Sequence, residues 1–164
     1  MRTLYLVRHA KAQMMAETDK LRELAPQGES DSAQLGRLFQ SSLVQPDRII
    51  CSDATRTKQT FEVMAEHGLV CQDVQFDDGI YHASASYLKD VIKAHGNVNL
   101  MIIGHNPALS ILLNHMAPAD SISPDLLHFP TACLAQLQIH DNISGDGVGD
   151  QGTELATFVR GATL

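Results

Sequence analysis

The sequence of 164 residues predicts an α/β fold. Short apolar runs of strand length alternate with longer segments whose apolar residues recur at helical spacing, which is the pattern of α/β proteins. Two further apolar runs near the C-terminus have no helical segment between them and predict an antiparallel pair of strands. The length suffices for one domain with a sizeable core and not comfortably for two.

The first part of the chain predicts two strands and two helices. Residues 3–7 are mostly apolar and predict a buried strand, whereas the polar segment 11–26 lacks clear periodicity and is expected to form a loop over the end of that strand. A helix is expected from Ser30 to about Leu43, because the apolar residues at 33, 35, 38 and 39 lie on one helical face. Residues 48–51 predict the second strand, and residues 54–67 predict the helix that follows it.

The second part continues the alternation and ends with the antiparallel pair. Residues 74–76 predict a weak short strand before the turn Asp77-Asp78-Gly79, and residues 86–94 predict a helix whose residues 87, 88, 91 and 92 point inward. A strand at 99–103, a helix at 108–116 and a loop at 118–130 follow. Residues 133–139 and 155–160 are expected to be antiparallel strands at the sheet edge, joined by the Gly- and Asp-rich segment 142–152 as an exposed, mobile turn.

Composition and charge exclude several classes of protein. The net charge of −7 argues against nucleic acid as the main partner. No apolar run approaches the roughly 18–20 residues of a membrane span, and the N-terminus lacks the apolar segment of a secretory signal. Cys51, Cys71 and Cys133 are odd in number and far apart, which favours buried reduced thiols over a disulfide or a metal site. We therefore expect a cytoplasmic protein without a membrane partner.

Three predicted junctions between a strand and a helix each carry a cationic or potentially cationic side chain. Arg8 and His9 follow the first strand, Arg56 lies in the helix after the second, and His105 follows the strand at 99–103. The ends of strands are where ligands bind in open α/β sheets. Each side chain alone could be a solvated or hydrogen-bonded surface residue, but random placement would seldom repeat the pattern at three junctions.

The residue types at these junctions suit phosphate chemistry. Arg8 would supply a phosphate clamp beside His9, whose ring nitrogen is a potential nucleophile. Ser52 or Asp53 can cap the second helix, and its first turn would bring the Ser52 hydroxyl, backbone N–H groups and the Arg56 guanidinium together as an anion site. Gly104 permits close approach of backbone to a ligand at the third junction.

The motifs resemble those of the histidine phosphatase superfamily, with the phosphoglycerate mutase-like fold, and within it the short SixA-type phosphohistidine phosphatases. The similarity runs from Thr3 to about Met116. Ala10 replaces the Gly of the commonest superfamily motif, and Ala25 stands where a capping Ser or Thr is usual, so we expect a less well capped helix there. The matching motifs are Leu6-Val7-Arg8-His9-Ala10, Asp19-x2-Arg22-x-Leu24-x3-Gly28, Ser52-x3-Arg56-x2-Gln59-Thr60, Ile80-Tyr81-His82-Ala83 and Gly104-His105-Asn106-Pro107.

The resemblance implies the architecture and the chemistry together. It implies a single domain over residues 1–164, with three α/β/α layers, a mostly parallel central sheet and an antiparallel edge strand. His9 would be the nucleophile that forms a phospho-His9 intermediate, and the phosphoryl oxygens would be bound by Arg8, Arg56, His105 and Ser52. No metal and no cofactor are expected. A metal site built from His9 and His105 is the rival interpretation, and neighbouring arginines and the lack of a nearby carboxylate disfavour it.

The interval between the second helix and Ile80 is too short for the helical cap that supplies a general acid in larger relatives. The carboxylates available are Asp73, Asp77 and Asp78, which we expect to be turn residues, with Asp78 kept as a candidate acid. His82 could lie at the pocket rim or donate a proton, and Arg22 could line the rim or pair with Asp19 or Glu23.

A site without a dedicated acid favours a leaving group that needs little protonation, such as the imidazole of phosphohistidine. An open site also favours a phosphate carried by a protein, and we expect a phosphorylated signalling or phosphotransfer protein, with a histidine-containing phosphotransfer domain as the candidate partner. Two alternatives stay open. One is a phosphatase of small phosphate esters or of phosphoserine and phosphothreonine. The other is a phosphate-binding module without turnover.

Overall fold

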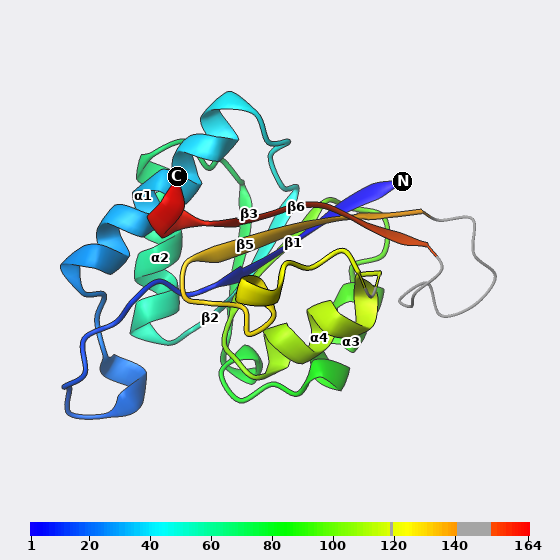
Figure 1. Cartoon of the computed structure of the whole chain (residues 1–164). Helices are drawn as coiled ribbons and strands as arrows, with labels where there is room; N and C mark the ends of the chain where they lie inside the picture. The colour runs from blue at the N-terminus through cyan, green and yellow to red at the C-terminus, as the bar shows by residue number, and fades with distance from the viewer. Residues whose placement is uncertain (119, 141–151) are drawn as a thin grey trace.

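The computed structural model describes residues 1–118, 120–140 and 152–164. Its centre is a six-stranded sheet with the strand order β3-β2-β4-β1-β5-β6 (Figure 1). The elements are β1 (Arg2–Arg8), η1 (Asp19–Leu21), α1 (Pro26–Ser41), β2 (Arg48–Ser52), α2 (Thr55–Glu66), β3 (Asp73–Asp77), η2 (Asp78–Ile80), α3 (Ala85–Ala94), β4 (Leu100–Gly104), α4 (Ala108–Met116), η3 (Pro124–Leu126), β5 (Cys133–Ile139), β6 (Thr153–Arg160) and η4 (Gly161–Thr163).

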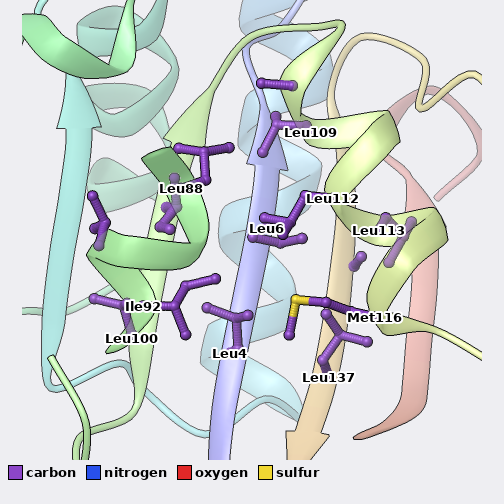
Figure 2. Close-up of a cluster of buried hydrophobic side chains, with 14 of the residues drawn as sticks. Leu4, Leu6, Leu88, Ile92, Leu100, Leu109, Leu112, Leu113, Met116 and Leu137 are labelled. Carbon is purple, nitrogen blue, oxygen red and sulfur yellow. The ribbon is translucent and has the colours of Figure 1, made fainter. Parts of the chain in front are cut away.

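Helices cover both faces of the sheet, so the predicted three layers are present. The α1–α2 pair lies on one face and the α3–α4 pair on the other (Figure 1). Successive side chains of β1 point to opposite faces. Leu4 and Leu6 pack among residues of α3 and α4, as Figure 2 shows, whereas Tyr5 and Val7 belong to the cluster on the α1–α2 side. Burial of both faces explains why the central strands are continuous apolar runs in the sequence.

The register of the parallel strands brings three loops together. β1 pairs in parallel with β4, and β2 pairs in parallel with the other side of β4. Arg8 lies opposite Gly104, and Cys51 lies opposite Ile103. The segments that follow β1, β2 and β4 therefore leave the sheet at one edge, where open α/β sheets bind ligands.

The helices form where expected, with differences at their first turns. α1 begins at Pro26 and not at Ser30, because proline at the first helical position has its φ angle already set for a helix. Its N-cap is Ala25, which makes no side-chain capping bond, as predicted. The predicted capping of α2 by Ser52 or Asp53 is wrong, since the N-cap is Ala54. The Ser52 hydroxyl instead contacts His105, at 2.8 Å from Nε2.

Other differences concern exposure and strand position. Tyr87 does not point inward, because it is 39% exposed and its hydroxyl donates to the Asp77 carboxylate. β5 pairs with both β1 and β6, so of this antiparallel pair only β6 lies at the edge of the sheet. The predicted loop 118–130 contains η3. Residues 142–151 of the predicted turn lie outside the described residues.

The described residues contain no helix long and apolar enough to cross a membrane. All three cysteines are free thiols, with Cys51 and Cys133 buried and Cys71 half-buried.

Candidate active site

The structure brings together the four side chains that the sequence analysis placed at separate junctions. Arg8, His9, Arg56 and His105 line one open pocket of about 550 Å³. Arg8 is the last residue of β1, His105 follows β4, and Arg56 is the second residue of α2. The ring centroids of His9 and His105 are 5.2 Å apart. These four residues therefore bring two imidazoles and two guanidinium groups into one pocket.

His9 has the protonation state and orientation of a nucleophile. The backbone carbonyl of Ala10 accepts a hydrogen bond from its Nδ1, at 2.8 Å. Because a carbonyl oxygen can only accept, the proton of the neutral ring is on Nδ1, and Nε2 keeps its lone pair. Burial lowers the pKa of His9 to about 3, and the charges of His105, Arg56 and Arg8 act in the same direction. The ring is therefore neutral at pH 7.

The Arg56 guanidinium is fixed from outside the pocket by Asp19. Its Nη1 donates to the backbone carbonyl of Asp19 at 2.8 Å, and its Nη2 donates to the Asp19 carboxylate at 3.1 Å. The same carboxylate accepts hydrogen bonds from the Tyr81 hydroxyl and, at 3.0 Å, from Arg22. These hydrogen bonds hold the pKa of Asp19 well below its usual range, and the bond from Tyr81 has the largest effect. Asp19 is thus an anionic anchor for Arg56.

His105 is supported from beneath by Ser52, which is fully buried and does not line the pocket. The Ser52 hydroxyl was expected to bind phosphate directly, but it lies beneath the pocket. The reason is that α2 begins at Thr55, so Ser52 remains in β2. Burial, followed by the charge of Arg56, lowers the pKa of His105 to about 4. His105 is therefore neutral at pH 7.

The carbonyl of Phe129 holds Arg8. It accepts hydrogen bonds from Arg8 Nη1 and from the side-chain amide of Asn106, each at 3.1 Å. Phe129 has a φ of 49°, in the left-handed region that costs an L-residue about 1–2 kcal/mol. Its ring is fully buried and lies 5.1 Å from that of Phe158, so packing compensates for the strained backbone.

The residues kept as candidates for the rim take different places. Arg22 lines the pocket and also pairs with Asp19, so both expected roles occur together. His82 is exposed and contacts Tyr81 with its ring tilted by 56°, the ring centroids being 4.2 Å apart. Asp78 is exposed, and neither it nor His82 lines the pocket.

The neighbouring carboxylates have structural partners, although Asp73 and Asp77 are the first and last residues of β3 and not turn residues as predicted. Asp77 accepts from the backbone N–H of Gly79 at 2.8 Å and caps η2. Asp73 pairs with Arg48 at 2.6 Å. Among the described residues, no carboxylate lines the pocket.

Sequence reasoning missed several residues of the site. Asp19 and Tyr81 lie in motifs that were recognised, yet nothing in their spacing shows that both contact Arg56 or each other. Arg160 lines the pocket through the pairing of β5 with β6, which the sequence predicted without the register that places this side chain there. Lys11, which neighbours the first motif and could add to the positive field, does line the pocket; the pocket residues not foreseen are Ala12, Met14, Asn106, Thr131 and Arg160.

Comparison with known sequences gives one family. The model of the histidine phosphatase superfamily (branch 1) matches residues 4–85. The chain is also similar to an uncharacterized protein of Mycobacterium tuberculosis strain H37Rv, with 28% identity over 141 residues that cover 81% of this chain and 87% of that protein. An uncharacterized chloroplastic protein of Arabidopsis thaliana is 30% identical over 118 residues, which cover 64% of this chain and 54% of that protein.

Three of the solved structures that resemble this chain are of SixA proteins. The SixA protein of Agrobacterium tumefaciens, a proposed phosphohistidine phosphatase, is 29% identical and has a TM-score of 0.76 over 96% of this chain and 97% of that one. Its counterpart from Nakamurella multipartitia is 25% identical, with a TM-score of 0.78 over 96% and 95% of the two chains. A protein histidine phosphatase SixA complexed with tungstate shares the fold, with a TM-score of 0.82, 17% identity and 99% coverage of both chains.

Proposed function

Because this chain belongs to the histidine phosphatase superfamily, as a SixA-type member, we propose that it removes the phosphoryl group from a phosphorylated histidine of another protein. Family membership and the SixA-like structures support phosphatase activity, and the substrate class and the mechanism are our proposal. The reaction passes through a covalent phospho-His9 intermediate. The observation that carries the mechanism is the neutral His9 ring, with its Nδ1 proton donated to the Ala10 carbonyl.

The first step is attack by His9 Nε2 on phosphorus, in line with the leaving group. A bond forms between Nε2 and phosphorus while the P–N bond of the substrate breaks, and the departing imidazole takes a proton from solvent. The His9 ring becomes cationic, and its Nδ1–H bond to the Ala10 carbonyl stabilises that charge. In the second step a water molecule attacks phosphorus and releases inorganic phosphate, and His9 returns to its neutral state.

The cations of the pocket stabilise the charge on the phosphoryl oxygens. Arg8 and Arg56 are held in place by Phe129 and Asp19 before substrate binds, so their guanidinium groups need no reorganisation during the reaction. A bound phosphoryl dianion raises the pKa of a nearby imidazole, which lets His105 bind a phosphoryl oxygen as a protonated donor. A protein histidine phosphatase SixA with the same fold forms a complex with tungstate, an oxyanion, which supports the proposal that this chain binds an anion.

The substrate class follows from the leaving group. A serine alkoxide leaves poorly unless an acid protonates it, which contributes about 10²–10⁴-fold in rate. No carboxylate of the described residues lines the pocket, whereas the imidazole of phosphohistidine leaves with a proton from solvent. The pocket is open, which suits a phosphate presented by a protein such as a histidine-containing phosphotransfer domain. The free thiols fit a reducing compartment and support a cytoplasmic location.

The test compares the parent protein and a His9→Ala variant on a phosphohistidine protein, a phosphoserine peptide and p-nitrophenyl phosphate. We expect the parent to favour phosphohistidine and, on rapid quenching with radiolabelled substrate, to carry an acid-labile, base-stable label. The variant should lose turnover and labelling while it still binds phosphate, because Arg8 and Arg56 remain.

Three results would contradict the proposal. Turnover by the variant within about tenfold of the parent, a loss of only 1.4 kcal/mol in transition-state stabilisation, would exclude the covalent mechanism. Preference for esters would move the substrate class to small phosphate esters or phosphoserine and phosphothreonine. Binding of phosphate by the parent without turnover of any of the three substrates would identify a binding module.

A further inference from the structure

The pocket holds more positive charge than one phosphoryl group needs. Arg8 and Arg56 line the pocket together with His9 and His105, and in the proposed mechanism these two arginines bind the phosphoryl group. Three more cations line the same pocket, and we call Lys11, Arg22 and Arg160 the outer cations. Five of the 12 lysines and arginines therefore line this one pocket, in a chain whose net charge is −7.

Two of the outer cations have no partner in the part of the chain that the structure describes. The side chains of Lys11 and Arg160 are exposed and make no hydrogen bond or ion pair there. Lys20, just outside the pocket, pairs with Asp53 at 2.9 Å. Arg22 is held by the Gln13 carbonyl at 2.7 Å and by Asp19 at 3.0 Å, through Nε and Nη1, which leaves its Nη2 available.

The backbones that carry Lys11 and Arg160 are fixed by close packing. The Lys11 carbonyl accepts from the Ala25 N–H at 2.9 Å and lies against Gly28, where any side chain would collide with it. Arg160 pairs with Cys133 across β5 and β6. The next residue, Gly161, packs so closely on α1 that a Cβ would lie 2.5 Å from the Asp31 carbonyl oxygen. The backbone from which both positive charges extend is therefore fixed, so binding would order only the two side chains.

We infer that the outer cations form a second anion subsite, which binds the carboxylate of an acidic residue beside the phosphorylated histidine of the substrate protein. This inference rests on the proposed function and specifies its substrate. A guanidinium group binds a carboxylate through paired hydrogen bonds, and a lysine adds a point charge. Because Lys11 and Arg160 are exposed, they can reach a group on the surface of a large partner. The subsite also attracts an acidic partner to a protein that is itself acidic.

The experiment uses two phosphohistidine peptides that differ only at the residues flanking the phosphohistidine, glutamate in one and glutamine in the other. We expect the parent to hydrolyse the glutamate peptide with a kcat/KM about tenfold higher, the equivalent of 1.4 kcal/mol in transition-state binding. Lys11→Gln and Arg160→Gln should each reduce the ratio of kcat/KM for the glutamate peptide to kcat/KM for the glutamine peptide from about tenfold to about twofold. Lys89→Gln in α3, away from the pocket, is the matched control and should change neither rate.

A charge reversal provides a second test, since Arg160→Glu should favour a third peptide with flanking lysines. The inference is overturned if the parent hydrolyses the glutamate and glutamine peptides with the same kcat/KM. It is also overturned if Lys11→Gln and Arg160→Gln lower kcat/KM equally for the two peptides. In either case hydrolysis of the two peptides by the parent would leave the proposed function intact. If the parent hydrolyses neither peptide, the proposed function fails instead. Calorimetric titration then compares the affinities of the parent protein for the two peptides. Tighter binding of the glutamate peptide supports the second anion subsite, and equal binding overturns it.

Discussion

The position of Arg56 depends on one acidic residue that does not line the pocket. Asp19 contacts Arg56 through both its backbone carbonyl and its carboxylate, and Tyr81 donates to that carboxylate. The side chain of Arg56 is only 8% exposed, so without Asp19 a buried charge would lose its counter-ion. In the proposed reaction Asp19 is therefore a positioning residue, which holds Arg56 without contacting the reacting atoms.

We predict that Asp19→Ala lowers kcat by about ten- to a hundredfold, because hydrogen bonds to charged groups contribute about 1.5–3 kcal/mol. KM should change less than kcat, since Arg56 would keep its charge and lose its fixed orientation. Tyr81→Phe keeps the ring and removes one donor, so its effect should be smaller. Asp73→Ala, which removes an ion pair outside the pocket, is the control. Steady-state kinetics would show a rise in activity if Asp19 instead competes with substrate for Arg56.

At the scale of elements, the start of α1 determines the path of the loop after β1. Pro26 begins the helix without a side-chain cap, and the first turn brings Gly28 against the backbone of Lys11. A short bridge between Ala12 and Leu24 then closes the loop on itself. The absence of a side chain at Gly28 is what allows this helix to lie so close to the loop that lines the pocket.

Gly28→Ala should therefore destabilise the protein, although alanine is normally preferred to glycine in a helix by about 1 kcal/mol. We expect a loss of about 1–3 kcal/mol in the free energy of unfolding, the usual cost of overpacking, together with reduced kcat/KM. Gly96→Ala is the control, since a Cβ there would meet nothing closer than 3.5 Å. Urea denaturation measures both variants. A Gly28→Ala protein as stable as the parent would show that the loop moves freely.

At the scale of the whole molecule, folding buries two neutral histidines in one pocket. His9 and His105 are each 8% exposed, and their pKa values fall to about 3 and about 4. An unfolded histidine has a pKa near 6.5. Between pH 6.5 and 4 the unfolded state therefore binds protons that the folded state does not, and acidification favours unfolding.

We predict that the free energy of unfolding falls as the pH is lowered from 6.5 to 4, with a slope of at most about 1.4 kcal/mol per pH unit for each of the two histidines. His105→Gln should flatten this dependence, whereas His115→Gln, at an exposed position of α4, should leave it unchanged. Phosphate should flatten it as well, because a bound anion favours the protonated rings. Urea titrations at several pH values would refute the prediction if the parent and His105→Gln show the same slope.

The sequence alone determined the elements and the four central side chains. Strands buried on both faces must be apolar along their whole length, so they stand out between polar turns. Arg8, His9, Arg56 and His105 follow strands or begin a helix, and a local pattern is sufficient to place them there. Parallel pairing of β1, β2 and β4 then brings them to one edge of the sheet.

Only the tertiary structure decided what supports these residues and what surrounds them. Ser52 contacts His105 and not the pocket, and Tyr87 turns outward to Asp77, because a side chain follows the partner that another element supplies. Asp19 reaches Arg56 across 37 positions of the chain. Arg160 joins the pocket through the long-range pairing of β5 and β6. Contacts of this kind depend on how distant segments pack, which leaves no periodic or local pattern in the sequence.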